Sequence, residues 1–70
     1  MKATVKNYQQ SENDNISWYV LTNSDKMTEE DAWGYLPHED FTNIEFIEME
    51  QSVASFNGFK HCFCFHEKIN

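Results

Sequence analysis

The chain has 70 residues, of which twelve are Asp or Glu, five are Lys and none is Arg, so its formal net charge is −7. This charge disfavours direct binding to nucleic acid or to anionic membranes, because phosphate repels carboxylates and Arg is the side chain best suited to bidentate phosphate recognition. Aromatic residues make up 16% of the chain, which is typical of a folded domain and not of a disordered acidic tail. We therefore expect one folded domain over residues 1–70 that carries its negative charge on a structured surface and favours basic partners.

The first part of the chain has the pattern of a β-hairpin. Residues 3–8 alternate loosely between apolar and polar side chains, and residues 16–21 are rich in aromatic and β-branched side chains. Between them, residues 11–15 are all loop-forming types. Two antiparallel strands joined by a turn are predicted here.

A short helix is predicted to begin at Thr28. Thr28 and Asp31 have capping-box spacing, acidic residues occupy the first turn, and Met27 is placed to pack back onto the helix. Gly34 weakens the helix and Pro37 ends it, so about two turns are expected. The residues predicted to face the sheet are Ala32, Trp33 and Leu36.

Residues 43–54 are compatible with either a helix or a strand. Thr42 and Glu45 have capping-box spacing, but a helix would have no continuous apolar stripe. A strand with one bulge between Phe46 and Ile47 separates the side chains better. It would point Ile44, Phe46, Ile47 and Met49 inward and Glu45, Glu48 and Glu50 outward.

The dipeptide Asn57-Gly58 predicts a hairpin turn, because both central positions of that turn require positive φ. It would lead into a last strand over residues 59–65, with Phe59, Phe63 and Phe65 on the core face. The predicted fold class is α+β, with a four-stranded antiparallel sheet and one short helix packed on one face in the order ββαββ. Its strand edges are compatible with a monomer or a homodimer.

Cys62, Cys64 and His66 would share one face of the last strand, as three potential metal ligands. Three ligands on one strand leave a tetrahedral zinc site incomplete, so we expect two buried free thiols and neither a metal nor another cofactor. A cysteine nucleophile is also disfavoured, because His61 points to the opposite face and the surrounding negative charge raises a thiol pKa. Free cysteines, together with the absence of a signal-like apolar segment after Met1, predict a cytoplasmic protein.

The acidic residues form the strongest candidate for a functional surface. In a strand, Glu48 and Glu50 would stand about 6.6 Å apart, a step comparable with that between successive phosphates, and Glu45 would extend the row. Aromatic side chains nearby in sequence would supply apolar contacts. The predicted partner-binding residues are Glu29, Glu30, Asp31, Trp33, Tyr35, Glu39, Asp40, Phe41, Glu45, Glu48 and Glu50.

The leading hypothesis is a small non-enzymatic inhibitor that binds a basic protein and blocks its nucleic-acid site. By size and charge it is analogous to phage or mobile-element anti-defence proteins, of the anti-CRISPR or anti-restriction kind. Two alternatives remain open: an immunity or antitoxin-like protein that neutralises a basic toxin, and a small structural zinc module that uses Cys62, Cys64 and His66.

Overall fold

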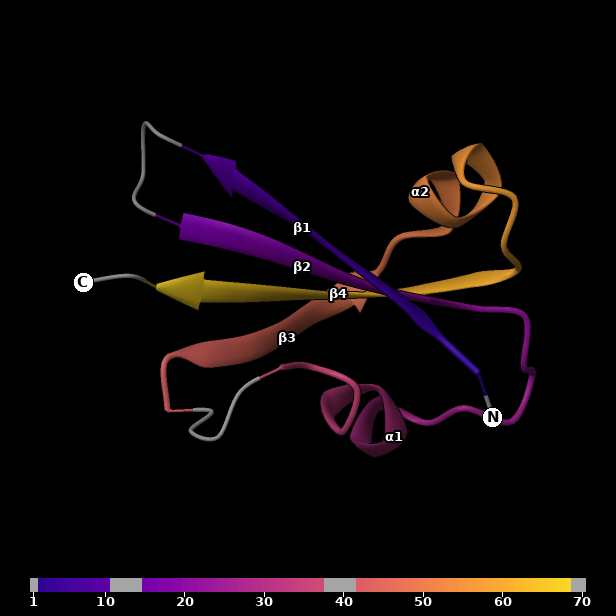
Figure 1. Cartoon of the computed structure of the whole chain (residues 1–70), viewed down its shortest axis with the longest axis horizontal. Helices are drawn as coiled ribbons and strands as arrows, with labels where there is room; N and C mark the ends of the chain where they lie inside the picture. The colour runs from indigo at the N-terminus through magenta and orange to yellow at the C-terminus, as the bar shows by residue number, and fades with distance from the viewer. Residues whose placement is uncertain (1, 11–14, 38–41, 69–70) are drawn as a thin grey trace.

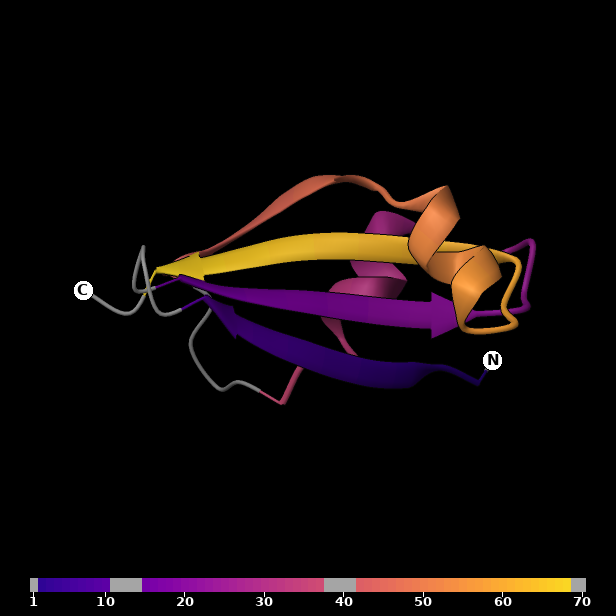
Figure 2. The same ribbon diagram turned by 90° about the horizontal axis from the view of Figure 1, so that it is seen from above.

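The computed structural model describes residues 2–10, 15–37 and 42–68, which form an antiparallel four-stranded sheet with strand order β1-β2-β4-β3. Figure 2 shows this order, with the strands lying side by side from indigo β1 to β3. The α+β class and the four-stranded sheet predicted from the sequence are confirmed. In chain order the elements are β1 (Thr4–Gln10), β2 (Asn15–Thr22), α1 (Glu29–Trp33), β3 (Ile44–Met49), α2 (Gln51–Phe56) and β4 (His61–Lys68).

The two helices lie on opposite sides of the sheet, which passes between them in Figure 1. The prediction of one helix is therefore wrong by one element, and the order is ββαβαβ. We call the side covered by α1 the first face and the side covered by α2 the second face. In the described part of the chain, no helix is long and apolar enough to cross a membrane.

The larger part of the core lies on the first face. Alternate residues of β2 and β4 point toward α1, and the ring of Trp33 meets the ring of Phe65 edge-on, with centroids 4.9 Å apart. The indole Nε1 of Trp18 donates a hydrogen bond of 2.9 Å to Oε1 of Glu67. Because the indole N–H keeps a partner, its ring is buried without an unsatisfied donor. The buried residues of this cluster are Trp18, Val20, Met27, Ala32, Leu36, Ile44, Phe63 and Phe65.

The start of α1 follows the sequence prediction. The Thr28 side chain accepts a hydrogen bond of 3.2 Å from the backbone N–H of Asp31, and an Asp31 carboxylate oxygen accepts one of 3.0 Å from the backbone N–H of Thr28. This reciprocal capping box satisfies two N–H groups that would otherwise lack partners. Met27 is buried in the same cluster as Ala32 and Leu36, as expected.

The second face holds a smaller apolar cluster of Leu21, Ala54 and Cys62 beneath α2. This helix ends in a Schellman motif. The N–H of Phe59 donates to the carbonyl of Ala54 at 2.8 Å, and the N–H of Gly58 donates to the carbonyl of Ser55 at 3.1 Å. The hairpin predicted at Asn57-Gly58 is therefore wrong: Gly58 has φ of +77°, whereas Asn57 has φ of −95° and caps the helix.

The changed turn also moves the last strand. β4 spans His61–Lys68 instead of the predicted residues 59–65. Phe63 and Phe65 lie in the first-face core as predicted, but Phe59 packs against the cluster on the second face. The reason is that Phe59 follows the left-handed residue of the helix end, where a hydrophobic contact back to the last helical turn is common.

β3 contains the predicted bulge, since its pairing with β4 shifts between Phe46 and Glu48. The bulge carries Ile47 as the additional residue. The prediction that Ile47 points into the core is wrong, because this residue is 40% exposed at the bulge. Met49 lies opposite Phe63 on the first face, the side predicted, but it is 45% exposed at the edge of the sheet and does not join the buried cluster. The turn predicted between the first two strands, at residues 11–15, lies outside the described residues, apart from Asn15, which begins β2.

Candidate functional site

Two of the predicted binding residues, Glu45 and Glu48, are exposed on the second face of the sheet. Glu45 lies opposite His66 in the β3–β4 pairing, and Glu48 lies opposite Cys64. Without the bulge, residues three apart would point to opposite faces, because side chains alternate along a strand. The bulge at Ile47 therefore places both carboxylates on the same face, as the sequence predicted.

Glu50 also lies near these two glutamates, but it is not a residue of the same strand, although the sequence predicted that it would be. β3 ends at Met49, and Glu50 is the N-cap of α2, with its backbone N–H donating to the carbonyl of Cys62 at 2.9 Å. A hydrogen bond between the Glu48 and Glu50 carboxyl groups raises the pKa of Glu50, as do partial burial and the charge of Glu48, whereas His66 lowers it. We call Glu45, Glu48 and Glu50 the acidic row.

Polar and titratable groups of β2 and β4 border the acidic row. Tyr19 lies opposite Cys64, and Ser17 lies opposite His66. Burial raises the pKa of the Tyr19 hydroxyl, and the nearby Cys64 and Glu50 raise it further. A hollow of about 330 Å³ adjoins the end of the row, with Glu45, His66 and Lys68 among its lining residues. Within the described residues, His66 is the group that favours the charged form of Glu50.

The two cysteines are buried free thiols, as predicted. Burial is the main cause that raises the pKa of Cys62 to about 12 and that of Cys64 to about 11, with Glu50 adding to both shifts. At neutral pH both are therefore thiols, whereas nucleophilic attack and metal binding require the thiolate. Among the described residues, no three His, Cys, Asp or Glu side chains converge closely enough to hold a metal ion.

His61 lies on the other face of β4 from the cysteines, as its place in the strand predicts. Its Nε2 atom is 2.8 Å from Oδ1 of Asp25, in the connection between β2 and α1. This hydrogen bond is the main cause that lowers the pKa of Asp25. His61 therefore holds the connection between β2 and α1 through Asp25, and it does not lie on the face of β4 that carries the two thiols.

The acidic residues of α1 do not join the acidic row. Glu29, Glu30 and Asp31 belong to the helix that covers the first face, whereas the row lies on the second. Asp31 is engaged in the capping box, and acids in the first turn of a helix interact favourably with its dipole. These three residues thus have a structural explanation that the row lacks.

Two predicted aromatic contacts are also separated from the row. Trp33 and Tyr35 are partly buried against the core of the first face. Glu39, Asp40 and Phe41, the remaining predicted binding residues, lie outside the described part of the chain.

Two exposed aromatic side chains were not among the predicted binding residues. Phe56, at the end of α2, is 91% exposed, and Tyr8, in β1, is 69% exposed. Tyr8 and Lys6 lie on the same face of β1, because side chains alternate along a strand, and this alternation could have identified Tyr8 as exposed from the sequence. Phe56 gave no comparable signal, because it directly precedes the dipeptide Asn57-Gly58, which predicted a hairpin turn and not a helix end.

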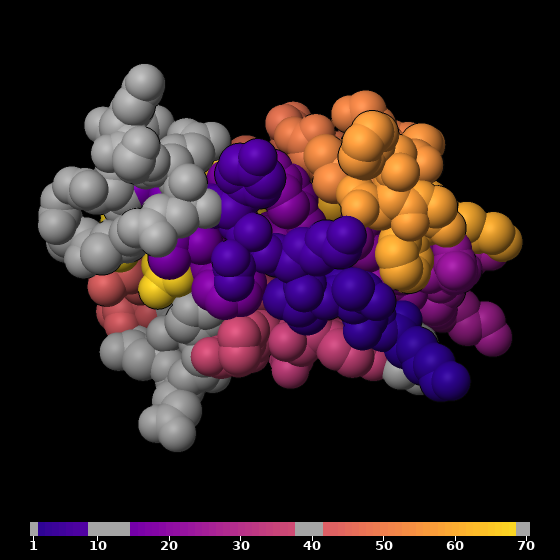
Figure 3. Space-filling model, turned by 45° about the horizontal axis from the view of Figure 1, so that its top comes forward, coloured from indigo at the N-terminus to yellow at the C-terminus, as the bar shows by residue number. Residues whose placement is uncertain are grey.

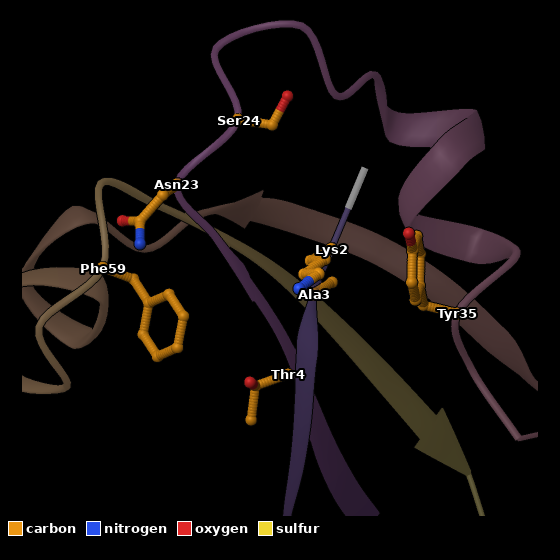
Figure 4. Close-up of a pocket in the computed structure, with 7 residues that line it drawn as sticks. All are labelled: Lys2, Ala3, Thr4, Asn23, Ser24, Tyr35 and Phe59. Atoms are coloured by element: carbon orange, nitrogen blue, oxygen red, sulfur yellow. The ribbon is translucent and has the colours of Figure 1, made fainter.

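Another hollow lies at the start of β1, and none of the acidic-row residues lines it (Figure 4). It measures about 690 Å³, and its wall includes the rings of Tyr35 and Phe59 with the side chains of Lys2, Thr4 and Asn23. The described residues that line it include no carboxylate, histidine or cysteine, and its titratable groups are Lys2 and Tyr35.

No protein-family model, curated protein or solved structure matches this chain.

Proposed function

We propose that the protein is a non-enzymatic inhibitor that binds a basic, nucleic-acid-binding protein and occupies its phosphate-binding surface with the acidic row. The observation that carries the proposal is the grouping of Glu45, Glu48 and Glu50 on one face of the sheet by a bulge and a helix start. A net charge of −7 would guide the approach of a cationic partner.

The energetics of the row favour a cationic ligand. The raised pKa of Glu50 means that its charged form is disfavoured beside Glu48. A partner Lys or Arg between the two carboxylates would relieve this repulsion and form charge-assisted hydrogen bonds. Row residues contribute little to folding if they are exposed, whereas a desolvated charge pair at an interface is costly to break.

Exposed aromatic side chains can supply the apolar part of such an interface. Phe56 belongs to the helix that starts directly after Glu50, and it is almost fully exposed. Interfaces are enriched in aromatic anchors surrounded by polar residues. Phe56 therefore replaces Trp33 and Tyr35, which pack against the core, as the apolar contact in the proposal.

The test begins with affinity capture from a host lysate and identification of the partner by mass spectrometry. Binding of the purified partner to DNA or RNA is then measured with increasing amounts of the parent protein or of the E45K/E48K/E50K variant. The proposal predicts that the parent displaces the nucleic acid and that the variant, while folded, does not. A partner that keeps its nucleic acid at saturating parent protein would contradict the proposal. If that partner were a basic toxin, the immunity-protein alternative would take its place.

A further inference from the structure

The sheet has two outer edges, β1 and β3, and they differ in how they are protected against pairing with another strand. The edge of β3 is interrupted by the bulge at Ile47 and carries the carboxylates of Glu45 and Glu48. Bulges and charges are devices that keep an edge strand from pairing. β3 is thus a protected edge.

The edge of β1 has neither a bulge nor a carboxylate. Its seven residues, Thr4–Gln10, pair with β2 without a register shift, and none of them is acidic. The one charged side chain of the strand, Lys6, donates a hydrogen bond of 2.9 Å from Nζ to Oδ1 of Asn57 at the end of α2. Its ammonium group is therefore held over the second face and not across the edge. Figure 3 shows indigo β1 exposed along the molecule, between the orange segment that contains α2 and the pink segment after α1.

We propose that β1 pairs antiparallel with β1 of a second copy, about a two-fold axis at Asn7, so that the two sheets join into one continuous sheet. Lys6 and Tyr8 flank Asn7 and point to the same face. In this register Lys6 lies opposite Tyr8 of the second copy, and the symmetry makes the contact twice. The sequence of β1 is therefore complementary to β1 of a second copy.

Charge favours β1 as the place where two copies meet. Each copy carries a net charge of −7, so most faces of the molecule repel one another, but β1 has a net charge of +1 from Lys6. The exposed ring of Tyr8 would cover the aliphatic stem of Lys6 from the second copy, in a cross-strand pair that includes a cation–π contact. The ammonium group can keep its bond to Asn57, because Lys has three N–H donors.

The paired sheet would present both acidic rows on one face, because antiparallel neighbours in a sheet related by a two-fold axis share their faces. In a flat sheet the rows would be roughly 34 Å apart, since about 4.8 Å separates neighbouring strands. Two rows at a fixed separation would bind a dimeric partner with higher avidity than one. The pairing itself does not depend on the proposed inhibitor function.

Sedimentation equilibrium of the full chain over a wide concentration range tests the proposal, with Tyr8→Lys and Tyr8→Glu as the informative pair. Tyr8→Lys places two positive charges opposite each other twice and is expected to weaken the dimer by at least about tenfold. Tyr8→Glu places a carboxylate opposite Lys6 and is expected to keep the dimer. General repulsion between acidic chains predicts the reverse order, because the Lys variant is less negative than the parent and the Glu variant is more negative.

Met49→Lys serves as the matched control, since it makes the same change of charge at an exposed residue of β3, the opposite edge of the sheet, and should leave the dimer constant unchanged. Circular dichroism establishes that each variant is folded, which is expected because Tyr8 is 69% exposed. A parent that remains monomeric at every concentration would overturn the proposal. So would a dimer that Tyr8→Glu weakens more than Tyr8→Lys.

Discussion

The carboxyl groups of Glu48 and Glu50 share a hydrogen bond, although one residue lies in β3 and the other caps α2. Two carboxyl groups can form such a bond only when one of them holds a proton. The bond therefore raises the pKa of Glu50. The protonation of Glu50 thus depends on how the end of β3 and the start of α2 are positioned relative to each other.

Stability should fall as the pH rises through the raised pKa of Glu50. In the unfolded chain Glu50 loses its proton near its ordinary pKa of 4.5, whereas the folded protein holds that proton to higher pH. The folded state binds more protons in this window, so the free energy of unfolding decreases from about pH 4.5 upward through the folded pKa. Glu50→Gln should remove this part of the decline, as measured by urea unfolding across a pH series.

Glu45→Gln is the control for the pH series, because it removes a carboxylate of the same row without touching the Glu48–Glu50 bond. This variant should show the same decline as the parent. If Glu50→Gln and the parent gave parallel curves above pH 4.5, the bond between the two carboxyl groups would not be a feature of the folded protein.

Gly58→Ala is expected to destabilise the protein by about 1–2 kcal/mol, the cost of a left-handed conformation for an L-residue with a side chain. Gly58 has φ of +77°, and a Cβ atom there would meet nothing within 4 Å, so the cost is conformational and not steric. Gly58→Asn should lose less, because Asn tolerates this conformation better. Urea unfolding measures both. Equal stability of Gly58→Ala and the parent would be inconsistent with a left-handed residue at the end of α2.

The start of α1 was predictable from the sequence, and the second helix was not. The capping box of Thr28 and Asp31 is a local signal that is formed by residues next to each other in the chain. α2 has six residues, too few for stability of its own, and it depends on contacts of Ala54 with Leu21 and Cys62. The dipeptide Asn57-Gly58 is compatible with both a hairpin and a helix end, so the sequence alone did not separate them.

The acidic row was only partly predictable. Because side chains alternate between the two faces of a strand, the sequence pattern predicted a bulge next to Ile47 and placed Glu45 and Glu48 on one face. The separation of the row from Glu29 and Glu30 was not predictable. β4 lies between β2 and β3 in the sheet, so the connection that contains α1 must cross one face, and local sequence does not determine which face.

The native thiols should react slowly with iodoacetamide at mildly alkaline pH. A rise in the pKa of Cys64 from 9.0 to about 11 lowers its thiolate fraction about a hundredfold, and Cys62 is shifted further. Burial adds steric protection. Mass spectrometry should detect rapid modification only after unfolding in urea. In a Phe56→Cys control, the added exposed thiol should react at once, and native thiols that react equally fast would show that the second-face cluster opens readily.

The most direct test of the acidic row compares two matched neutralisations for binding to the captured partner. E45Q/E48Q and E29Q/E30Q remove the same charge from exposed positions on opposite faces of the sheet. Isothermal titration calorimetry should show that E45Q/E48Q weakens binding by at least about 2 kcal/mol, roughly thirtyfold, with a reduced salt dependence. E29Q/E30Q should bind almost as tightly as the parent, although it should lose about 0.3–1 kcal/mol of stability per residue, because both acids lie in the first turn of α1. Circular dichroism should show that both variants are folded at the temperature of the titration. Equal losses of affinity in the two variants would show that net charge alone matters, and unchanged affinity in E45Q/E48Q would contradict the assignment of the row as the binding surface.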